Sequence, residues 1–486
     1  MSTFHVLNFG CRASQADGAA LKQHLRDAGL REATSADESH IAVLNTCTVT
    51  ATADAEVRQI IRRIHRTNPG CRILVTGCYA QRAPEEVAQL PGVTWVVGNS
   101  HKHVIAEVLG GTKETGVGNQ EPGENPGFKI QNPSTRIPQP ESRVPSRESH
   151  VASPRTPPTV LVGEISEEFH FAPVFPDDRT RPTLKVQDGC DARCSFCIIP
   201  EVRGGSRSLP PERVLDEVRR LEESGTKELV LSGINLGSYG KDLGRRITFL
   251  GLVERILKET SIPRVRISSI EPMDVSPELI RLVSREPRMA RHFHVPLQSG
   301  SDRILRLMNR RYWAAHYAER LQAIHEQIPN CGIGADVMAG FPGETDEDHQ
   351  TSLRFIESLP FNYLHVFPYS SRPGTPAAAR NGQLNGRIIQ ERGQEIRALV
   401  ARKRQAFLEA QIGRWLSAVT LSEQQEGARV ALSSNYLRLV LPGCDIPANV
   451  LLEARVGRVH DGLVYASPET EPASSPRAAI EPSLRT

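Results

Sequence analysis

The sequence predicts an α/β protein with three parts: an N-terminal domain with a parallel sheet, a partial (βα)6 barrel, and a small C-terminal β-barrel. Three observations lead to this prediction. Strand-like and helix-like hydrophobic patterns alternate over residues 1–110, which is typical of a parallel sheet with helices on its faces. A second series of such alternations fills the middle of the chain. Short strands separated by turn residues follow it, and 486 residues suffice for about three domains.

The N-terminal domain is expected at residues 1–110. Its strand candidates are 4–10, 41–47, 72–78 and 94–99, with helical patterns between them, one of them capped near Thr52. Cys11, Cys47 and Cys78, here called the first trio, each lie at the carboxyl end of a different strand. In an open parallel sheet these ends share one edge, so the three thiols are able to meet there. The alternative is ordinary packing of cysteine in the core.

The second domain is expected at residues 160–412. Six strand candidates alternate there with amphipathic helices, at 182–188, 227–235, 264–270, 292–298, 332–340 and 362–370. Six such units are too few for a closed eight-stranded barrel, so we predict a partial barrel that is open at one side. Its active face is expected at the carboxyl ends of the strands.

The remaining segments differ sharply in composition. Residues 111–159 are rich in proline, serine, glycine and charged residues without a hydrophobic period, which predicts a disordered linker, and a disordered tail is expected at 469–486. A long basic helical pattern at 386–411 leads to the third domain at 413–468. Its short strand candidates, 415–423, 428–433, 436–443 and 450–466, favour a small β-barrel.

The most specific motif is CxxxCxxC at Cys190, Cys194 and Cys197, here called the second trio, on the loop after the first barrel strand. Three soft thiolates on one short loop suit a cubane iron-sulfur cluster, and three ligands for four irons leave one iron open for chemistry. A zinc site would need a fourth ligand, and no second cysteine pair or histidine pair follows at the required spacing. Disulfides are not expected, because the sequence shows no secretion signal.

The second trio, with Phe196 before its last cysteine, resembles the radical S-adenosylmethionine superfamily. The sequences NFGCRASQ, NTCTVT and VTGCYAQ around the first trio resemble the N-terminal domain of the methylthiotransferases. The resemblance implies two 4Fe-4S clusters, one on each trio, with S-adenosyl-L-methionine chelating the open iron at the second, catalytic trio. It also implies that the cluster on the first trio carries the sulfur. The last domain resembles the TRAM domain, an RNA-binding module.

The sequences NTCTVTATAD, GCYAQ, VFPYSSRPGTPAA and SSNYLRLVLPG look most like the branch that modifies N6-threonylcarbamoyladenosine at position 37 of transfer RNA. The resemblance implies that a methylthio group is added to C2 of that base by radical chemistry. Sister branches act on N6-isopentenyladenosine in tRNA or on an aspartate of a ribosomal protein, and both remain alternatives. A non-catalytic RNA-binding protein whose metal centres only hold its loops is an alternative of another class.

Candidate cofactor contacts lie at the strand ends around the second trio. They are Phe196, Gly233, Asn235, Ser269, Glu271 and Gln298. Gly233 would let the backbone approach the methionyl part of the cofactor. Each of these residues is equally well explained as a turn or cap residue.

Candidate substrate contacts are Arg203 and Arg207, directly after the second trio, and Tyr369 and Arg372, after the last barrel strand. A threonylcarbamoyl group carries a carboxylate, which suits a guanidinium, whereas a prenyl group requires an apolar wall. We therefore expect Arg203 or Arg207 to bind the substrate side chain, and Tyr369 to stack on a base. The alternatives are surface charges and a rigid turn bounded by prolines.

Composition limits the partners of the protein. The formal net charge is only +3, so an RNA-binding surface must come from local clustering of basic residues. No run of 18 apolar residues occurs, so no membrane partner is expected. Cysteines used as reduced ligands indicate a cytoplasmic protein. The expected partners are the anticodon loop of tRNA, an electron-donor protein and a sulfur source.

Overall fold

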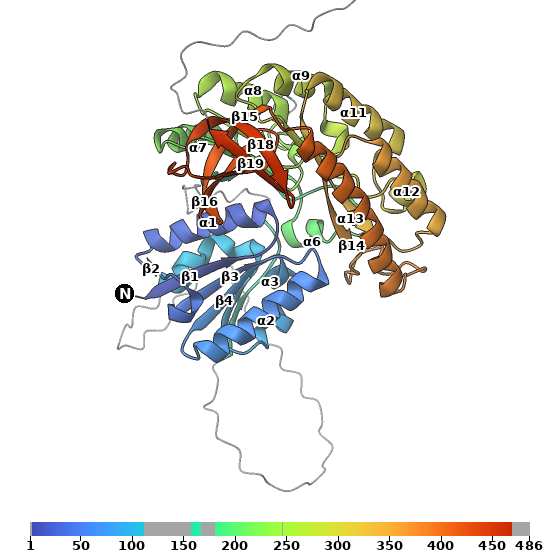
Figure 1. Ribbon diagram of the computed structural model, residues 1–486. Helices are drawn as coiled ribbons and strands as arrows, with labels where there is room; N and C mark the ends of the chain where they lie inside the picture. Colours follow the sequence, from blue (N-terminus) through green and yellow to red (C-terminus); the bar gives the residue numbers. More distant parts are fainter. Residues whose placement is uncertain (1, 111–156, 167–179, 245, 469–486) are drawn as a thin grey trace, which may run out of the picture.

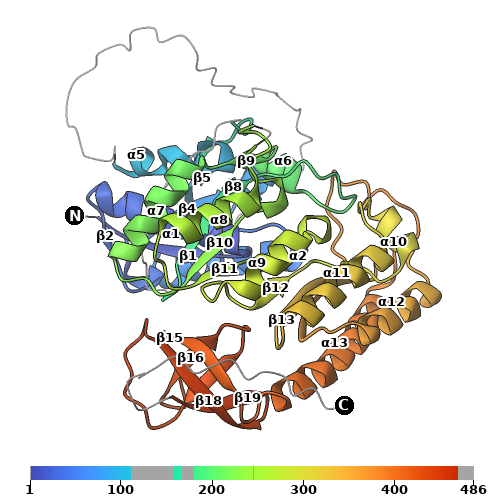
Figure 2. The ribbon, with the colours of Figure 1, turned by 90° about the horizontal axis from the view of Figure 1, so that it is seen from above.

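The computed structural model describes residues 2–110, 157–166, 180–244 and 246–468. The predicted linker at 111–159 lies outside the described residues except for 157–159, and the predicted tail at 469–486 lies outside them entirely. Figure 1 shows an α/β part in blue, a central part running from green to orange, and a C-terminal barrel in red. Figure 2 shows the same three parts from above. The predicted fold class is confirmed.

The N-terminal sheet has six parallel strands in the order β2-β1-β3-β4-β5-β6. Its strands are β1 (Thr3–Asn8), β2 (Arg31–Glu32), β3 (Ile41–Thr46), β4 (Arg72–Gly77), β5 (Val93–Val97) and β6 (Thr159–Leu161). Its helices are α1 (Arg12–Asp27), α2 (Ala51–Thr67), α3 (Cys78–Arg82), α4 (Pro84–Ala88) and α5 (Ile105–Gly110). Helix α1 packs Leu21 and Leu25 on one face, and α2 packs Val57 and Ile61 on the other. All four predicted strands are present.

Strand β6 changes one predicted boundary. It pairs in parallel with residues Trp95 to Val97 of β5, so the chain returns to the N-terminal sheet after residue 157. The expected domain boundary between 159 and 160 runs through this strand and is wrong. Because β6 is three residues long and partly exposed, it has no hydrophobic period that the sequence could reveal. The two-residue β2 was missed for the same reason.

The direction in which successive strands are added reverses between β1 and β3 of this sheet. From β1 the chain runs outward to β2 and then returns to β3 on the other side of β1. Helices α1 and α2, which follow β1 and β3, therefore cover opposite faces of the sheet. Such a switch point is where open α/β sheets bind ligands, and Cys11 and Cys47 directly follow the two strands that form it.

The central part is a partial barrel of six parallel strands. Two three-stranded sheets, β7-β10-β11 and β12-β13-β14, each follow chain order. The strands are β7 (Thr183–Lys185), β10 (Leu229–Ser232), β11 (Val265–Ile267), β12 (His292–His294), β13 (Gly332–Ala339) and β14 (Tyr363–Pro368). The Ile270 N–H donates to the His294 carbonyl at 3.0 Å and joins the two sheets. All six predicted strands are present.

Helices cover the outer side of these strands. The longer ones are α7 (Pro211–Glu223), α8 (Phe249–Glu259), α9 (Pro277–Arg285), α11 (Ala314–Gln327), α12 (Asp346–Ser358) and α13 (Gly386–Glu409). Shorter elements are α6 (Ile199–Arg203), α10 (Asp302–Leu307), β8 (Gln187–Asp188), β9 (Arg207–Ser208) and the 3-10 helices η1 (Ala36–Glu38), η2 (Asn99–Val104), η3 (Leu236–Ser238) and η4 (Pro272–Asp274). Among the described helices, none has both the length and the apolar composition required to cross a bilayer.

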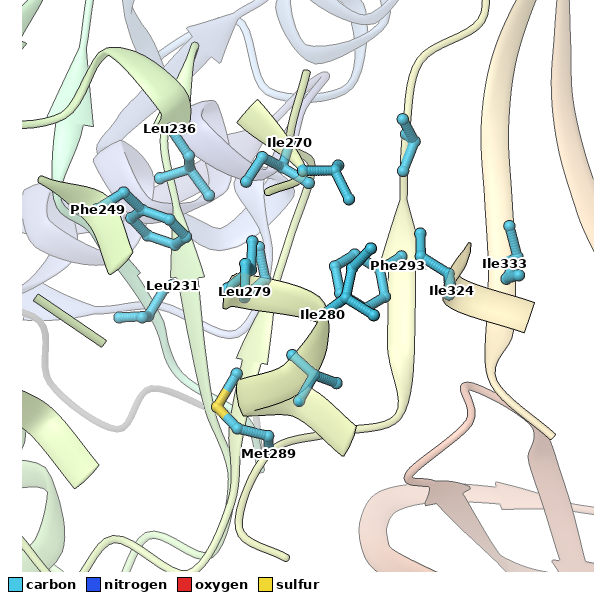
Figure 3. Packing of buried hydrophobic residues seen from close by; sticks show 14 of the residues in the cluster. Leu231, Leu236, Phe249, Ile270, Leu279, Ile280, Met289, Phe293, Ile324 and Ile333 are labelled. Carbon is cyan, nitrogen blue, oxygen red and sulfur yellow. The ribbon is translucent and has the colours of Figure 1, made fainter. Parts of the chain in front are cut away.

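The core of the central part lies between the strands and their outer helices. Figure 3 shows Leu231 and Phe293 of the strands packed with Leu279 and Ile280 of α9 and Ile324 of α11. Because side chains alternate along a strand, the residues next to these apolar positions point to the inner side of the barrel. The side chains at these alternate positions therefore line the interior of the partial barrel.

The C-terminal part is a closed five-stranded barrel in the order β15-β16-β17-β19-β18. Its strands are β15 (Trp415–Gln425), β16 (Ala428–Ser433), β17 (Arg438–Leu441), β18 (Leu451–His460) and β19 (Leu463–Pro468). The predicted segment at 450–466 forms two antiparallel strands rather than one. They are joined at Asp461 and Gly462, whose φ angles of 49° and 73° are those a two-residue hairpin turn requires.

The turn between β16 and β17 inserts into the N-terminal end of the partial barrel. A Cβ on Gly332, the first residue of β13, would lie 2.2 Å from the carbonyl oxygen of Asn435 in this turn. Tyr436, in the same turn, stacks on His292 with 4.3 Å between ring centroids. The C-terminal barrel therefore covers the end of the central barrel at which its strands begin.

Glu228 is fully buried where these two barrels meet. Arg266 donates to it at 2.7 Å and also donates to two carbonyl oxygens at the end of β16. Two more guanidiniums lie beside the Glu228 carboxylate: a nitrogen of Arg181 is 3.0 Å from one of its oxygens, and a nitrogen of Arg264 is 3.5 Å from the other. Burial alone would raise the pKa of Glu228, but the guanidiniums outweigh burial and lower this pKa to about 2. Burial lowers the pKa of Arg181 and of Arg264, because one carboxylate compensates three cations.

Replacing Glu228 with glutamine is expected to lower the free energy of unfolding by about 3 kcal/mol, because three buried guanidiniums lose their carboxylate. The folded-state pKa lies below the ordinary value of 4.5, so this stabilisation is present above pH 4.5 and is lost as the pH falls toward 2. Urea unfolding at pH 7 and at pH 3 measures both effects. The matched Glu223→Gln variant alters an exposed residue of α7 and is expected to stay within about 0.5 kcal/mol. Equal stability of the two variants would contradict this account.

Candidate active site

The first trio converges at the carboxyl edge of the N-terminal sheet. Cys11 immediately precedes α1, Cys47 follows β3, and Cys78 is the first residue of α3, directly after β4. Gly10 has a φ of 94°, and a Cβ there would lie 2.7 Å from the Cys47 Sγ, so this approach requires glycine. Burial, and next the nearby Cys11 and Cys78 sulfurs, raise the pKa of Cys47 to about 12. The three sulfurs therefore occupy one small space.

The second trio lies on the loop between β8 and α6. The Cys197 N–H donates to the Cys194 carbonyl at 3.1 Å and tightens the loop. Burial, and next the nearby Cys194 and Cys190 sulfurs, raise the pKa of Cys197 to about 12. Two side chains donate toward this trio: Asn235 Nδ2 lies 3.8 Å from the Cys190 Sγ, and an Arg310 nitrogen lies 3.4 Å from the Cys194 Sγ. The loop thus gathers three sulfurs with donors around them.

Both trios lie on the interface between the N-terminal and central parts. Cys78 packs against Ile198 and Val202, and Ile198 is the residue after Cys197. The Asn99 side chain donates to the Cys78 sulfur at 3.5 Å and to the Val202 carbonyl at 2.8 Å. Helices α3 and α6 contact each other directly. The two trios are therefore on the same side of the molecule rather than on opposite sides.

A cavity of about 360 Å³ opens beside Cys194. Asn235 and Glu271, both predicted cofactor contacts, line it together with Arg310 and Tyr312. Arg310 forms an ion pair with Glu271, but burial outweighs this attraction and raises the pKa of Glu271. The Oδ1 of Asn235 is buried and has no partner among the described residues. The cavity suits a polar ligand, because an unpaired buried polar atom costs free energy.

The other predicted cofactor contacts differ in their surroundings. A Cβ on Gly233 would lie 2.9 Å from the nearest side chains, so the close approach there requires glycine. Gln298 has a left-handed φ of 66°, and its buried Oε1 lacks a partner in the described part of the chain. Ser269 is half-buried just after β11. Phe196 packs edge to face on Phe341, with 6.5 Å between ring centroids, in an apolar cluster, and it is not among the residues that line the cavity.

Arg203 lies in a buried cluster of ion pairs that joins the two parts. Its two terminal nitrogens each lie 3.0 Å from a carboxylate, one of Asp17 on α1 and one of Asp188 on β8. Lys102 and Lys185 also contact Asp17. Burial alone would raise the pKa of Asp17, but the three cations lower it well below its usual value. This corrects the expectation that Arg203 binds the substrate, because buried carboxylates already occupy its guanidinium.

The loop after β14 makes a second connection between the parts. Arg372 is buried and donates to Asp54 of α2 at 2.6 Å, so it is a domain contact rather than the expected substrate contact. Tyr369 is also buried and packs edge to face on Phe341, with 5.8 Å between ring centroids. Arg207 differs from both, since it is half-buried and takes part in no ion pair among the described residues. Of the four predicted substrate contacts, Arg207 alone keeps an accessible charge.

Sequence reasoning missed a polar wall on the inner side of the partial barrel. His294 Nε2 lies 3.2 Å from a carboxylate oxygen of Asp336, and the ligand atoms of these two residues and His365 all lie within 4.8 Å of one another. The Tyr363 hydroxyl lies 2.7 Å from His292 Nε2. These residues alternate with core positions, as in HFH at 292–294. That alternation within the predicted barrel strands is the signal that would have found them.

Two family models match the chain. The Radical SAM superfamily matches residues 184–356, and a family described as Uncharacterized protein family UPF0004 matches residues 3–98. The first match contains the second trio, and the second match contains the first trio.

The chain is also similar to known proteins over most of its length. Threonylcarbamoyladenosine tRNA methylthiotransferase MtaB from Aquifex aeolicus is 36% identical over 437 residues, which cover 89% of this chain and 95% of that protein. tRNA-2-methylthio-N(6)-dimethylallyladenosine synthase from Pelotomaculum thermopropionicum is 32% identical and covers 88% of each chain. The solved structure of the radical S-adenosylmethionine methyltransferase TsrM from Kitasatospora setae, with cobalamin and a 4Fe-4S cluster bound, has a TM-score of 0.49 at 16% identity and covers 78% of this chain and 77% of that one.

Proposed function

Because this chain belongs to the radical S-adenosylmethionine methylthiotransferase family, we propose that it adds a methylthio group to C2 of N6-threonylcarbamoyladenosine at position 37 of transfer RNA. The observation that carries this proposal is the presence of two three-cysteine sites on one domain interface. Methylthiolation needs a place that activates a C–H bond and a place that holds sulfur. Two adjacent sites provide for both.

The residues present fit the cofactors that the family implies. Each trio offers three thiolates, which are the preferred ligands of a 4Fe-4S cluster and leave one iron open. The unpaired buried oxygens of Asn235 and Gln298 and the cavity beside Cys194 suit a polar cofactor such as S-adenosyl-L-methionine. When bound, these groups supply the radical that activates C2 and the sulfur-bearing methyl group.

The protein's own side chains position these groups and balance their charge. Asn235 directs an N–H donor at the Cys190 sulfur, and Arg310 directs one at the Cys194 sulfur, so these side chains orient two of the three ligands. Burial alone would lower the pKa of Arg203. The nearby Cys78 and Cys11 sulfurs and the carboxylates of Asp188 and Asp17 outweigh burial and raise this pKa well above its usual value. Arg203 is therefore a positioning residue that places positive charge beside the first trio.

The choice of nucleoside rests on the relatives and on the barrel wall. Relatives named for threonylcarbamoyladenosine and for dimethylallyladenosine are 36% and 32% identical to the chain, so identity alone separates them little. The inner wall at His292, His294, Asp336 and Tyr363 is polar. A polar wall suits a carboxylate and a hydroxyl group better than a prenyl group. This favours the threonylcarbamoyl substrate.

We assign tRNA binding partly to the C-terminal barrel at 413–468. Trp415 is 44% exposed, and Arg458 lies over the Tyr465 ring at 4.4 Å, so aromatic and guanidinium groups are present for stacking and phosphate contacts. Arg207, beside the second trio, is a candidate phosphate contact. An electron-donor protein and a sulfur source complete the partners. We place the protein in the cytoplasm, where the six cysteines of the two trios would stay reduced.

Mass spectrometry of total tRNA nucleosides from cells with and without this chain tests the proposal. The 2-methylthio derivative of N6-threonylcarbamoyladenosine is expected only when the chain is present, and its unmodified precursor is expected to accumulate otherwise. A change confined to the isopentenyladenosine derivative would instead support the sister activity. No change in either nucleoside, together with no 5′-deoxyadenosine from the reduced protein, would support a non-catalytic RNA-binding role.

A further inference from the structure

One arginine of the N-terminal part reaches into the partial barrel. Arg12 follows Cys11 and begins α1, and α1 packs along β7, the edge strand at the open side of the barrel. An Arg12 terminal nitrogen donates to the Tyr436 hydroxyl at 2.7 Å, and the guanidinium lies 5.9 Å from the centre of that ring. Because Tyr436 stacks on His292 of β12, Arg12 connects the first trio, through Tyr436, to the inner wall of the barrel.

Arg12 differs from four arginines that form buried ion pairs at these interfaces. The paired ones are Arg203 with Asp17, Arg266 with Glu228, Arg310 with Glu271 and Arg372 with Asp54. In the part of the chain that the structure describes, Arg12 takes part in no ion pair, and Asp336 of the inner wall is engaged by His294. A half-buried guanidinium whose hydrogen-bond partner is one neutral hydroxyl keeps donors for an anionic ligand.

The charge of Arg12 acts on the inner wall. Burial, followed by the charges of Arg266, His294 and Arg12, lowers the pKa of His292 well below its usual value. Burial also lowers the pKa of His365, and His294 and Arg12 add to this effect against the opposing charge of Asp336. These imidazoles are therefore neutral at pH 7. Near these two imidazoles, His294 and Arg266 are paired with Asp336 and Glu228, whereas Arg12 has no carboxylate partner among the described residues.

We propose that Arg12 binds the carboxylate of the N6-threonylcarbamoyl group, with Tyr436 holding its guanidinium in place. This inference rests on the proposed function and identifies the residue that selects its substrate. A guanidinium forms two parallel hydrogen bonds to a carboxylate, which gives direction as well as affinity. A prenyl group would desolvate the same guanidinium without giving it an anionic partner, so Arg12 also disfavours the sister substrate. Since Arg12 is the neighbour of Cys11, a substrate held there stays close to the first trio.

The test compares full-length wild type with Arg12→Gln, Arg12→Lys and Tyr436→Phe. The matched control is Arg285→Gln, at an exposed position at the end of α9. One readout is the Kd for an anticodon stem-loop RNA carrying N6-threonylcarbamoyladenosine, divided by the Kd for the same RNA with unmodified adenosine. The other is kcat/KM for methylthiolation of threonylcarbamoylated tRNA, with iron content and 5′-deoxyadenosine formation recorded for each variant.

The wild type is expected to prefer the threonylcarbamoylated RNA by about 10- to 100-fold, the range of a hydrogen-bonded charge pair. Arg12→Gln is expected to bind both RNAs equally and to lose a similar factor in kcat/KM. Arg12→Lys should keep part of the preference, Tyr436→Phe should lose several-fold, and Arg285→Gln should match the wild type. The ratio of two Kd values on one protein is internally controlled, so it remains decisive even if a variant holds less iron.

Two different failures are distinguishable. If the wild type shows no preference for the threonylcarbamoylated RNA and does not modify it, the proposed function is wrong. If the wild type modifies that tRNA while Arg12→Gln keeps both the binding preference and the rate, the proposed function stands and the role of Arg12 is wrong.

Discussion

Replacing Cys194 with alanine is expected to abolish reductive cleavage of S-adenosyl-L-methionine and, with it, all methylthiolation. The change leaves two thiolates where a cluster needs three, and it also removes the sulfur that accepts from Arg310 at 3.4 Å beside the cavity. After anaerobic reconstitution, the wild type is expected to hold about eight iron atoms per chain and the variant about four, since each cubane cluster holds four irons. Iron and sulfide analysis together with chromatography of 5′-deoxyadenosine measures both effects.

Cys331→Ala is the matched control for this variant. Cys331 lies directly before β13 in the same part of the chain and is buried in the hydrophobic core, where burial raises the pKa of its thiol. It belongs to neither trio, so this variant is expected to keep all its iron and to form 5′-deoxyadenosine. If Cys194→Ala kept about eight irons and still cleaved the cofactor, the assignment of the second trio would be wrong.

Replacing Cys47 with alanine is expected to separate the two halves of the reaction. Cys47 is buried between Cys11 and Cys78 and against Gly10, so its loss dismantles the first trio without touching the loop of the second. The variant should bind about four irons and still form 5′-deoxyadenosine, yet yield no methylthiolated nucleoside. Parallel measurement of iron, 5′-deoxyadenosine and modified nucleoside on one preparation makes the separation visible.

Cys71→Ala serves as the control in the same sheet. Cys71 is buried just before β4, and burial raises the pKa of its thiol, but it lies at the opposite end of that strand from Cys78. The Cys71→Ala variant is expected to keep both clusters and full activity. Methylthiolation at the wild-type rate by Cys47→Ala would show that the first trio does not carry the sulfur. Loss of cofactor cleavage in that variant would show that the two sites do not have separate roles.

The strands were predictable where apolar runs are long enough to carry a pattern. All ten expected strands of the first two parts exist, because runs such as IAVLN and KELVLS are buried on both faces between turn signals. The misses are instructive. Strands β2 and β6 have two and three residues, too few for a period, and β6 reaches its sheet only after the chain has passed through 111–156. The hairpin at Asp461 and Gly462 is a local turn signal that was overlooked.

The arginines show where sequence reasoning reached its limit. Arg203 and Arg372 stand among glycines or prolines beside the active face, a pattern that fits a substrate contact and a domain contact equally well. Their carboxylate partners, Asp17 and Asp54, come from a different part of the chain. No local pattern predicts these pairs, since they exist only after the N-terminal sheet has docked on the barrel. Arg12 went unnoticed for the same reason.

The sequence by itself determined which chemistry this protein can hold. Soft thiolates at CxxxCxxC spacing, and three more cysteines placed after successive strands, specify their ligands through side-chain type and local geometry alone. The tertiary structure decided which groups remain free to act. Whether a guanidinium is satisfied or available depends on which distant carboxylates are buried against it, as Asp17 is against Arg203 and as none is against Arg12 in the residues described. Burial makes that difference large, because a charge removed from water needs a partner, and the chain supplies partners only where its separate parts pack together.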